Sequence, residues 1–297
     1  MTPALSLFYG GMVRKKNILS TTMHSYAAIA VVSIQWILFG YSFVFGGYGP
    51  LIGDGSFVLL NNVSFAPIDY APTIPHQLFL MFQLAFAVIT PALISGSIAE
   101  RMKFPAFLAF ILLWTTFVYD PIAHWIWGNG GWIRELDALD FAGGSVIHIS
   151  SGVSALVAAI YIGKRSNHDS IKPHNIPMTM IGAGLLLFGW YGFNAGSALA
   201  INDIALNAFI ATNTSAAAAG LSWMFCEWLI HKKPTALGFV SGIVAGLVSI
   251  TPGAGFVSPF ASLMIGLIGG IVCFYGVTVL KKKIASDDAL DAFGCHG

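Results

Sequence analysis

The amino-acid sequence predicts an all-α, polytopic membrane protein, and two observations carry this prediction. Of the 297 residues, 56% are hydrophobic and only 9% are charged, and the mean hydropathy is +0.77. Soluble domains carry about 25% charged residues, so this chain has too few charges to cover a water-facing surface. The second observation is a series of apolar stretches, each long enough to cross the ~30 Å hydrocarbon layer as a helix.

Eight stretches of the sequence have the required length and composition. They lie at about 18–45, 76–99, 104–126, 141–163, 175–198, 204–230, 235–254 and 256–280. The shorter apolar runs at 1–13 and 288–297 are expected to belong to two further helices. Between the spans, residues 46–75 contain no Lys or Arg and form the one long loop.

The basic residues fall in alternate loops between these stretches. Of the 14 Lys and Arg residues, only Arg134 lies in the opposite set of loops. The others are Arg14, Lys15, Lys16, Arg101, Lys103, Lys164, Arg165, Lys172, Lys232, Lys233, Lys281, Lys282 and Lys283. By the positive-inside rule their loops are cytoplasmic, whereas 46–75, 127–140 and 199–203 face outside. We therefore expect a multi-pass protein of a plasma or bacterial inner membrane.

Other classes of function find no support in the sequence. The formal net charge is +1, and no basic cluster is interleaved with aromatic residues, which argues against a nucleic-acid partner. The three cysteines lie in apolar stretches without a close pair, so neither a disulfide framework nor a thiolate metal site is expected. No nucleophile elbow, His-Glu-x-x-His motif or phosphate-cradling loop is present, and we expect no enzyme activity.

Two histidines stand out because each follows an acidic residue by eight positions within or at the start of an apolar run. His148 follows Asp140, and His296 follows Asp288. At 1.5 Å per residue, His148 lies roughly 12 Å along its helix, near the middle of the bilayer. Ionisable side chains at that depth are costly and usually face a bundle interior or a cavity. The two histidines are therefore predicted to form a pair, and the alternative for His148 is a structural core histidine.

The predicted topology brings these two histidines in from opposite sides of the membrane. The span with His148 enters from outside, and the run with His296 enters from the cytoplasm. Two halves of opposite orientation, about 1–165 and about 174–297, form an inverted repeat, and transporter sites lie near the midplane where such repeats meet. The histidines near span ends, among them His24, His76 and His124, are expected to be solvated or interfacial.

Glycines recur every fourth residue in three of the spans. They are found at Gly192 and Gly196, at Gly238, Gly242 and Gly246, and at Gly266 and Gly270. Small residues at this spacing line one helix face and let helix backbones approach closely. The pattern predicts a tightly packed multi-helix bundle.

Several motifs resemble those of the ammonium transporter family (Amt/MEP/Rh), and of its Amt branch in particular. They are LFYGGMVR at 7–14, PIAHWIWG at 121–128, LDFAGGSVIH at 139–148, KPHNIP at 172–177, FGWYGFNAGS at 188–197 and DDALDAFGCHG at 287–297. They follow the family's order from end to end of the chain. The resemblance implies a single transmembrane domain over 1–297 with an ammonium-transporter-like bundle of inverted five-helix repeats. Family members have eleven helices, of which about nine are covered, so we expect a fragment that lacks the start of helix 1 and most of helices 10–11.

The resemblance also implies a function, which is the transport of ammonium or its analogue methylammonium. A bare ion is costly in a low-dielectric core, whereas neutral ammonia crosses far more cheaply. Ammonium would be recruited from outside, deprotonated, and conducted as ammonia through an apolar pore. The twin histidines His148 and His296 would line this pore.

Further residues are assigned by the same resemblance. The recruitment site would comprise Phe86, Trp127, Phe193 and Ser197, with Phe86 and Phe193 also forming a phenyl gate, and Asp140 and Gln83 would be structural residues near the site. Aromatic faces attract a cation, and a hydroxyl accepts an N–H bond that ammonium can donate and potassium cannot. Without the resemblance, these aromatic residues would be interpreted as interfacial or core residues and the serine as a helix cap.

The family is trimeric, so a homotrimer in a lipid bilayer is expected. A PII-type regulatory protein is a further expected partner, through a C-terminal tail that these 297 residues do not include. No cofactor and no metal are expected. Two alternatives remain open: an ammonium sensor without significant conduction, and a membrane haem or quinone protein with His148 and His296 as axial ligands, which predicts a Soret band and a cavity wide enough for a macrocycle.

Overall fold

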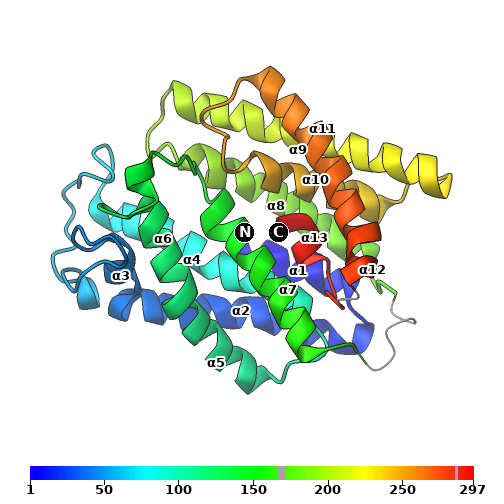
Figure 1. The fold of residues 1–297 in the computed structure, drawn as a ribbon, viewed down its shortest axis with the longest axis horizontal. Helices are drawn as coiled ribbons and strands as arrows, with labels where there is room; N and C mark the ends of the chain where they lie inside the picture. The colour runs from blue at the N-terminus through cyan, green and yellow to red at the C-terminus, as the bar shows by residue number, and fades with distance from the viewer. Residues whose placement is uncertain (166–171, 285–286) are drawn as a thin grey trace.

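The structure is a computed structural model that describes residues 1–165, 172–284 and 287–297. Within these ranges it is almost entirely helical, and the one β-type pairing is an isolated bridge between Ile68 and Ala71. Figure 1 shows α2, α4, α5 and α7 in the lower part of the bundle and α9, α10 and α11 in the upper part.

The α-helices are numbered in chain order. They are α1 (Thr2–Met12), α2 (Ile18–Gln35), α3 (Tyr41–Phe45), α4 (His76–Ile98), α5 (Phe104–Trp114), α6 (Asp120–Trp127), α7 (Ser150–Ile162), α8 (Ile176–Gly196), α9 (Asp203–His231), α10 (Ala236–Ile250), α11 (Pro259–Tyr275), α12 (Lys281–Ile284) and α13 (Ala292–His296). Within the described residues, four π-helical segments lengthen or join them, namely η2 (Trp36–Gly40), η4 (Thr115–Tyr119), η6 (Gly144–Ile149) and η8 (Gly276–Leu280). Such segments are rare and occur frequently at functional sites, and here η6 carries His148.

Seven helices in the described ranges are long and apolar enough to cross a membrane. They are Lys15–Phe45, His76–Ile98, Phe104–Trp127, Gly144–Ile162, Ile176–Gly196, Asp203–His231 and Pro259–Ile284. Each coincides with a predicted span, so the prediction of a multi-pass membrane protein is confirmed. The eighth predicted span, 235–254, contains a shorter helix, α10, which has 15 residues.

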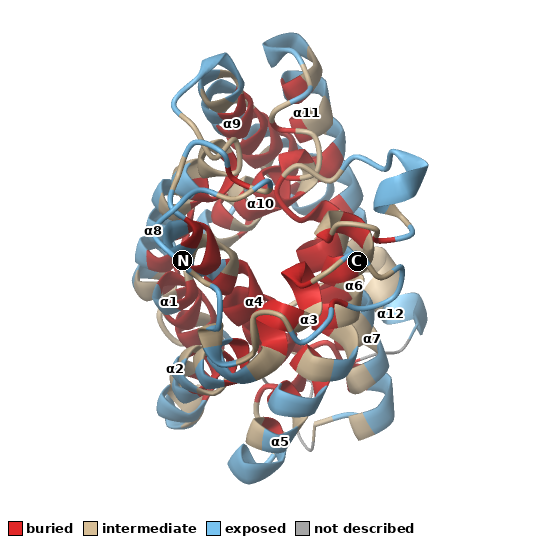
Figure 2. Cartoon of the chain, turned by 90° about the vertical axis from the view of Figure 1, so that its left-hand side faces the viewer, coloured by how far each residue is buried: buried red, intermediate tan, exposed pale blue. Residues whose placement is uncertain are grey.

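Burial follows the pattern expected of a bundle in lipid. Figure 2 shows that the buried residues face the centre of the ring of helices and that exposed residues lie around its outside. Large apolar side chains are among the exposed ones, including Phe117 at 70%, Tyr161 at 90% and Phe188 at 75%. An apolar surface of this kind suits hydrocarbon and would be unfavourable in water.

Glycines allow α10 and α11 to pack closely against α9. A Cβ atom added to Gly246 or Gly266 would lie 2.4 Å or 2.3 Å from the carbonyl oxygen of Ser215, which is on α9. A larger residue at either position would push the helices apart, so the predicted small-residue packing is confirmed here. Gly192 differs, because no atom of the described residues lies within 4 Å of a Cβ added there.

The loops predicted to face outside lie together. The backbone N–H of Trp132 donates to the carbonyl of Pro50 at 3.2 Å, which joins the loop 127–140 to the loop 46–75. The hydroxyl of Thr73 donates to the carbonyl of Leu199 at 2.5 Å, which joins the loop 46–75 to the segment after α8.

An ionic cluster joins the loops at the other end of the bundle, which we call the basic side. The Glu100 carboxylate accepts hydrogen bonds from the backbone N–H and the Nε of Arg14, both at 3.0 Å. Arg165 donates to the Asp287 carboxylate through Nε at 2.9 Å and Nη2 at 2.6 Å, and its Nη1 lies 3.7 Å from Glu100. Arg101 donates to the carbonyl of Asp287 at 2.5 Å. The cluster therefore ties the ends of α1, α4 and α7 to the segment that precedes α13.

The two carboxylates of this cluster are held in their charged form. Both side chains are 0% exposed, and burial alone would raise their pKa values. For Asp287, hydrogen bonds and the charge of Arg165 outweigh burial and lower the pKa from 3.8 to about 2. For Glu100, the hydrogen bonds from Arg14 likewise hold the pKa below its ordinary value despite burial. The cluster therefore remains ionised at neutral pH.

Candidate functional site

Three cavities follow one another through the centre of the bundle. The wide cavity has a volume of about 280 Å³ and is lined by Phe86, among other residues. The narrow cavity has a volume of about 20 Å³, and Phe193 and His148 line it. The basic-side cavity has a volume of about 40 Å³ and shares four lining residues with the narrow cavity, namely Phe8, Tyr9, Val244 and His296.

Three aromatic rings separate the wide cavity from the narrow one. The ring centroid of Phe86 lies 4.4 Å from that of Phe193, and the two planes are inclined by 40°. On its other side Phe86 meets the indole of Trp127 edge to face, with the centroids 5.7 Å apart and the planes at 79°. The three aromatic residues predicted for the recruitment site are therefore in contact, although they come from α4, α6 and α8.

Two uncharged acceptors face the wide cavity beside these rings. The Ser197 hydroxyl donates to the carbonyl of Phe193 at 2.8 Å, which leaves the lone pairs of its oxygen available to an incoming donor. The Oε1 atom of Gln83 is buried and has no hydrogen-bond partner among the described residues. Aromatic faces and neutral acceptors together suit a small cation that carries N–H groups.

Asp140 caps the segment that carries His148. One carboxylate oxygen accepts the backbone N–H groups of Gly143 and Gly144 at 2.7 Å and 2.6 Å, and the other accepts those of Ser145 and Val146 at 2.8 Å and 3.1 Å. Burial raises the pKa of this carboxyl, and the four amides partly offset that effect.

The backbone of Asp140 also contacts the indole of Trp127, which lines the wide cavity. Its carbonyl oxygen accepts the indole N–H of Trp127 at 2.9 Å. One residue therefore connects the start of the His148 segment to the aromatic cluster. Because backbone amides occupy both of its carboxylate oxygens, the role of Asp140 is structural.

The structure brings His148 and His296 together between the narrow and basic-side cavities. Their Nδ1 atoms lie 3.0 Å apart, and the ring centroids are 5.1 Å apart with planes inclined by 30°. Both side chains are buried, at 3% and 8% exposed. Trp190 stacks on His148 with its centroid at 5.5 Å and an angle of 18°. Because the two Nδ1 atoms face each other, one donates and the other accepts, and each ring retains its Nε2 atom for a second partner.

Close backbone contacts seat the short helix that carries His296. A Cβ atom added to Gly152 on α7 would lie 2.3 Å from the backbone nitrogen of Gly297, so α13 rests directly on α7. The carboxylate of Asp288 accepts the backbone N–H of Phe293 at 2.7 Å. These contacts place His296 against His148.

The haem alternative does not fit this geometry. Two axial ligands lie on opposite faces of a macrocycle with about 2 Å between each nitrogen and the metal, so their nitrogens are about 4 Å apart. Here the two facing nitrogens are 3.0 Å apart, and the adjoining narrow cavity has a volume of about 20 Å³.

Other histidines do not lie where the sequence predicted. His24, His76 and His124 are 3%, 1% and 0% exposed, so the expectation of solvated side chains is wrong for these three. The Nε2 atom of His76 lies 2.6 Å from the Tyr41 hydroxyl, and both ring nitrogens of His124 contact backbone carbonyls at 2.6 Å and 2.5 Å. These partners come from α3 and from the loop that follows it, and the sequence around each histidine contains no signal for them.

Several residues at the cavities were not predicted. Tyr9 lines the narrow and basic-side cavities, Trp190 stacks on His148, and Trp223 and Asp291 line the basic-side cavity. Aromatic residues are frequent in apolar helices, so their identity alone does not distinguish pore lining from packing. Tyr9, Trp190 and Asp291 lie within the resemblance motifs, but the motifs alone imply no role for them.

Comparisons with known proteins agree with this architecture. The profile of the Ammonium Transporter Family matches residues 1–297. An ammonium transporter of Bacillus subtilis is 60% identical over 297 residues, which cover 100% of this chain and 73% of the relative. Ammonium transporter Amt1 of Archaeoglobus fulgidus is 49% identical, with coverage of 100% and 74%.

Solved structures give the same result. The crystal structure of Candida albicans Mep2 superimposes with a TM-score of 0.93 at 37% identity, covering 100% of this chain and 66% of that one. A structure described as a sensor Amt protein superimposes with a TM-score of 0.92 at 31% identity, covering 100% of this chain and 75% of that one.

Proposed function

Because the chain belongs to the ammonium transporter family, we propose that it carries ammonium across a membrane by separating the proton from ammonia between the wide and narrow cavities. The observation that carries this proposal is the 3.0 Å contact between His148 and His296 beneath the aromatic cluster. Ionisable side chains are costly at this depth in a membrane. A buried histidine pair is therefore better explained by a role in proton transfer than by a contribution to stability.

Recruitment takes place in the wide cavity. The rings of Phe86 and Trp127 attract a cation, each by about 0.5–2 kcal/mol depending on its desolvation. The oxygen atoms of Ser197 and Gln83 accept N–H bonds from ammonium, which has four N–H groups. Potassium has a similar charge but donates no hydrogen bond, so these acceptors favour ammonium.

Deprotonation takes place at the contact between Phe86 and Phe193. Beyond it the narrow cavity has a volume of about 20 Å³ and includes Leu5 and Leu186 in its lining. An ion entering this space would lose its hydration at a cost of several kcal/mol, which apolar walls cannot repay. Neutral ammonia loses much less hydration free energy than the ion does, so ammonia is the species that passes the contact between Phe86 and Phe193.

The histidine pair relays the proton. His148 Nε2 is buried without a hydrogen-bond partner in the described part of the chain, and it lies on the side chain that lines the narrow cavity. A proton accepted by His148 passes across the Nδ1 contact to His296, which also lines the basic-side cavity. Ammonia crosses beside the pair and recovers a proton on the far side, so one positive charge moves with each ammonia.

The orientation and assembly also belong to this proposal. The basic side faces the cytoplasm of a plasma or bacterial inner membrane, in agreement with the positive-inside rule, so the wide cavity opens outward. The halves 1–165 and 174–297 form the inverted repeat, which agrees with His148 and His296 entering from opposite ends. The homotrimer and a PII-type regulatory partner are carried over from the family resemblance.

Ammonium-evoked current in proteoliposomes tests the function. The protein is expressed from its complete gene, and His148→Leu is compared with Phe117→Leu, a control at a position that is 70% exposed and outside the cavities. We expect a current in the parent and the control and none in His148→Leu. An unchanged current in His148→Leu would remove the relay from the mechanism. Saturable methylammonium binding without current or uptake in the parent would favour the sensor alternative, for which the sensor Amt protein is a precedent.

A further inference from the structure

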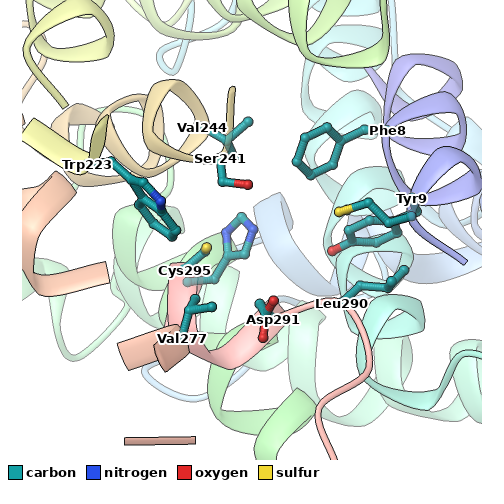
Figure 3. A pocket seen from close by; sticks show the side chains of 11 residues that line it. Phe8, Tyr9, Trp223, Ser241, Val244, Val277, Leu290, Asp291 and Cys295 are labelled. Atoms are coloured by element: carbon teal, nitrogen blue, oxygen red, sulfur yellow. The ribbon is translucent and has the colours of Figure 1, made fainter. Parts of the chain in front are cut away.

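The basic-side cavity has the chemistry of a cation site. Figure 3 shows the Asp291 carboxylate at one edge of this cavity, the Trp223 indole at another, and the Ser241 side chain between Trp223 and Phe8. The cavity has a volume of about 40 Å³, close to the ~30 Å³ that one water molecule occupies in the liquid. It is therefore large enough for one ammonium-sized group.

Its polar groups are not used up by contacts within the protein. Among the residues that the structure describes, the Ser241 hydroxyl has no hydrogen-bond partner. The Asp291 side chain is 32% exposed, and one of its two oxygens is held by a cation. A carboxylate, a hydroxyl and an indole ring therefore line one small space.

The chain itself places an ammonium group at this carboxylate. The Nζ atom of Lys281 lies 2.5 Å from Oδ1 of Asp291. A lysine side chain ends in a primary ammonium, which donates N–H bonds as a free ammonium ion does. Its stem is flexible and its side chain is 23% exposed, so it can swing into the adjoining solvent.

The position of the cavity explains why a counter-charge is useful here. His296 lines it, and in the proposed relay this is where the proton arrives and where ammonia leaves the narrow cavity. When ammonia takes the proton, an N–H bond forms on ammonia, the N–H bond of the imidazolium breaks, and the ring becomes neutral. The ammonium formed is a cation in a partly desolvated space, and an adjacent carboxylate stabilises it.

We propose that the basic-side cavity is a second ammonium-binding site, at which ammonium takes the place of the Lys281 side chain on Asp291. This inference rests on the proposed function, since it concerns the same pathway at its other end. Lys281 limits how long the product ion stays, because its tethered ammonium competes for the same oxygens. Ammonium that accumulates on the basic side occupies the same site and slows further uptake.

Inhibition from the basic side tests the proposal. Oriented membrane vesicles containing the complete gene product are loaded with increasing concentrations of ammonium, and the initial rate of methylammonium uptake is measured. Lys281→Met removes the competing ammonium and keeps an unbranched stem, so the half-inhibiting internal concentration should fall about three- to tenfold. Asp291→Asn removes the charge that holds the ion, so this concentration should rise at least tenfold.

Controls separate this site from a general effect. Lys282→Met changes an exposed neighbour and should behave as the parent does. In the double variant with Asp291→Asn, Lys281→Met should have no further effect, because its competitor role needs the carboxylate. Internal potassium at the same concentrations should not inhibit.

The outcomes are distinguishable from failure of the proposed function. A parent that takes up no methylammonium and carries no current would remove the proposed function itself. A parent that transports, together with Lys281→Met and Asp291→Asn variants whose internal inhibition equals that of the parent, would overturn the second site. Equal inhibition by internal potassium would overturn it as well, since the site would then not recognise N–H groups.

Discussion

Replacement of Arg165 by Gln should destabilise the folded protein measurably. Arg165 holds the Asp287 carboxylate through its side chain and through its backbone N–H at 2.8 Å, and both side chains are nearly buried, at 7% and 0% exposed. The shift of the Asp287 pKa from 3.8 to about 2 corresponds to about 2 kcal/mol in favour of the folded state. Removal of one partner of a buried pair costs about 3–5 kcal/mol. We therefore expect Arg165→Gln to lower the free energy of unfolding by about 2–4 kcal/mol.

Thermal unfolding in detergent at neutral pH measures this loss. A change of that size should lower the unfolding temperature by on the order of 5–10 °C. Arg165→Lys keeps the charge but not the paired geometry and should lie between the parent and Arg165→Gln. Lys172→Gln is the matched control, because it removes an exposed charge shortly before α8. A shift for Arg165→Gln no larger than that of Lys172→Gln would refute the reasoning.

The Arg165–Asp287 pair also predicts how acid changes the stability of the protein. The folded-state pKa of Asp287 is below its ordinary value, so its contribution is complete above pH 3.8 and is lost as the pH falls through about 2. In Arg165→Gln the pKa of Asp287 should rise toward its ordinary value, because burial remains and the guanidinium of Arg165 is gone, whereas Arg101 and the backbone N–H at position 165 still stabilise the carboxylate. Acid unfolding of this variant should therefore begin at a higher pH than in the parent, and coincident acid transitions would contradict this account.

Three further substitutions test the candidate site. Trp127→Leu should raise the half-saturating ammonium concentration about 2- to 30-fold, the equivalent of one lost cation–π contact, and identical methylammonium competition curves would count against it. Ser197→Ala should reduce discrimination of ammonium from potassium about 3- to 10-fold in competition assays, and unchanged discrimination would remove the hydroxyl from recognition. Gly152→Ala should displace α13 and abolish ammonium-evoked current, because the added Cβ would lie 2.3 Å from the backbone nitrogen of Gly297, whereas Gly184→Ala, with no described atom within 4 Å of its Cβ, should conduct normally. Equal currents in both glycine variants would show that α13 tolerates the displacement.

The spans were predictable because the bilayer imposes a length and an apolar composition on each helix. The residues at which the helices begin and end were less predictable. The predicted span 141–163 begins as a helix only at Gly144, after the turn that Asp140 caps, and α10 is shorter than the 235–254 predicted for it. Hydropathy does not resolve such ends, since a capped turn next to a helix can be as apolar as the helix.

The two histidines could be singled out from the residues alone, because an imidazole deep in an apolar helix is unusual. Phe86 and Phe193 could not, since a phenylalanine in a membrane helix is ordinary, and only the resemblance to the family implies a role for them. The Lys281–Asp291 pair was missed for another reason. Lys281 belongs to the basic pattern that predicts topology, Asp291 lies within a resemblance motif, and nothing in their spacing of ten positions shows that they meet at a cavity.

The ionic cluster shows a third limit of the sequence. Arg14 and Arg165 belong to the basic pattern that predicts the orientation, and in the structure each is paired with an acid, 86 positions away for Arg14 and 122 for Arg165. Long-range pairs of this kind depend on which helices pack together, and that information is not contained in any local pattern.

The residue Asp140 has a consequence for attempts to change this protein. Its carbonyl holds the indole of Trp127, and its carboxylate holds the first turn of the segment that carries His148. The proposed recruitment site and the proposed proton relay thus share one structural support. A designer who reshapes this loop to admit bulkier amines should find that throughput changes as well, and compensating substitutions would have to be sought on both sides of the turn.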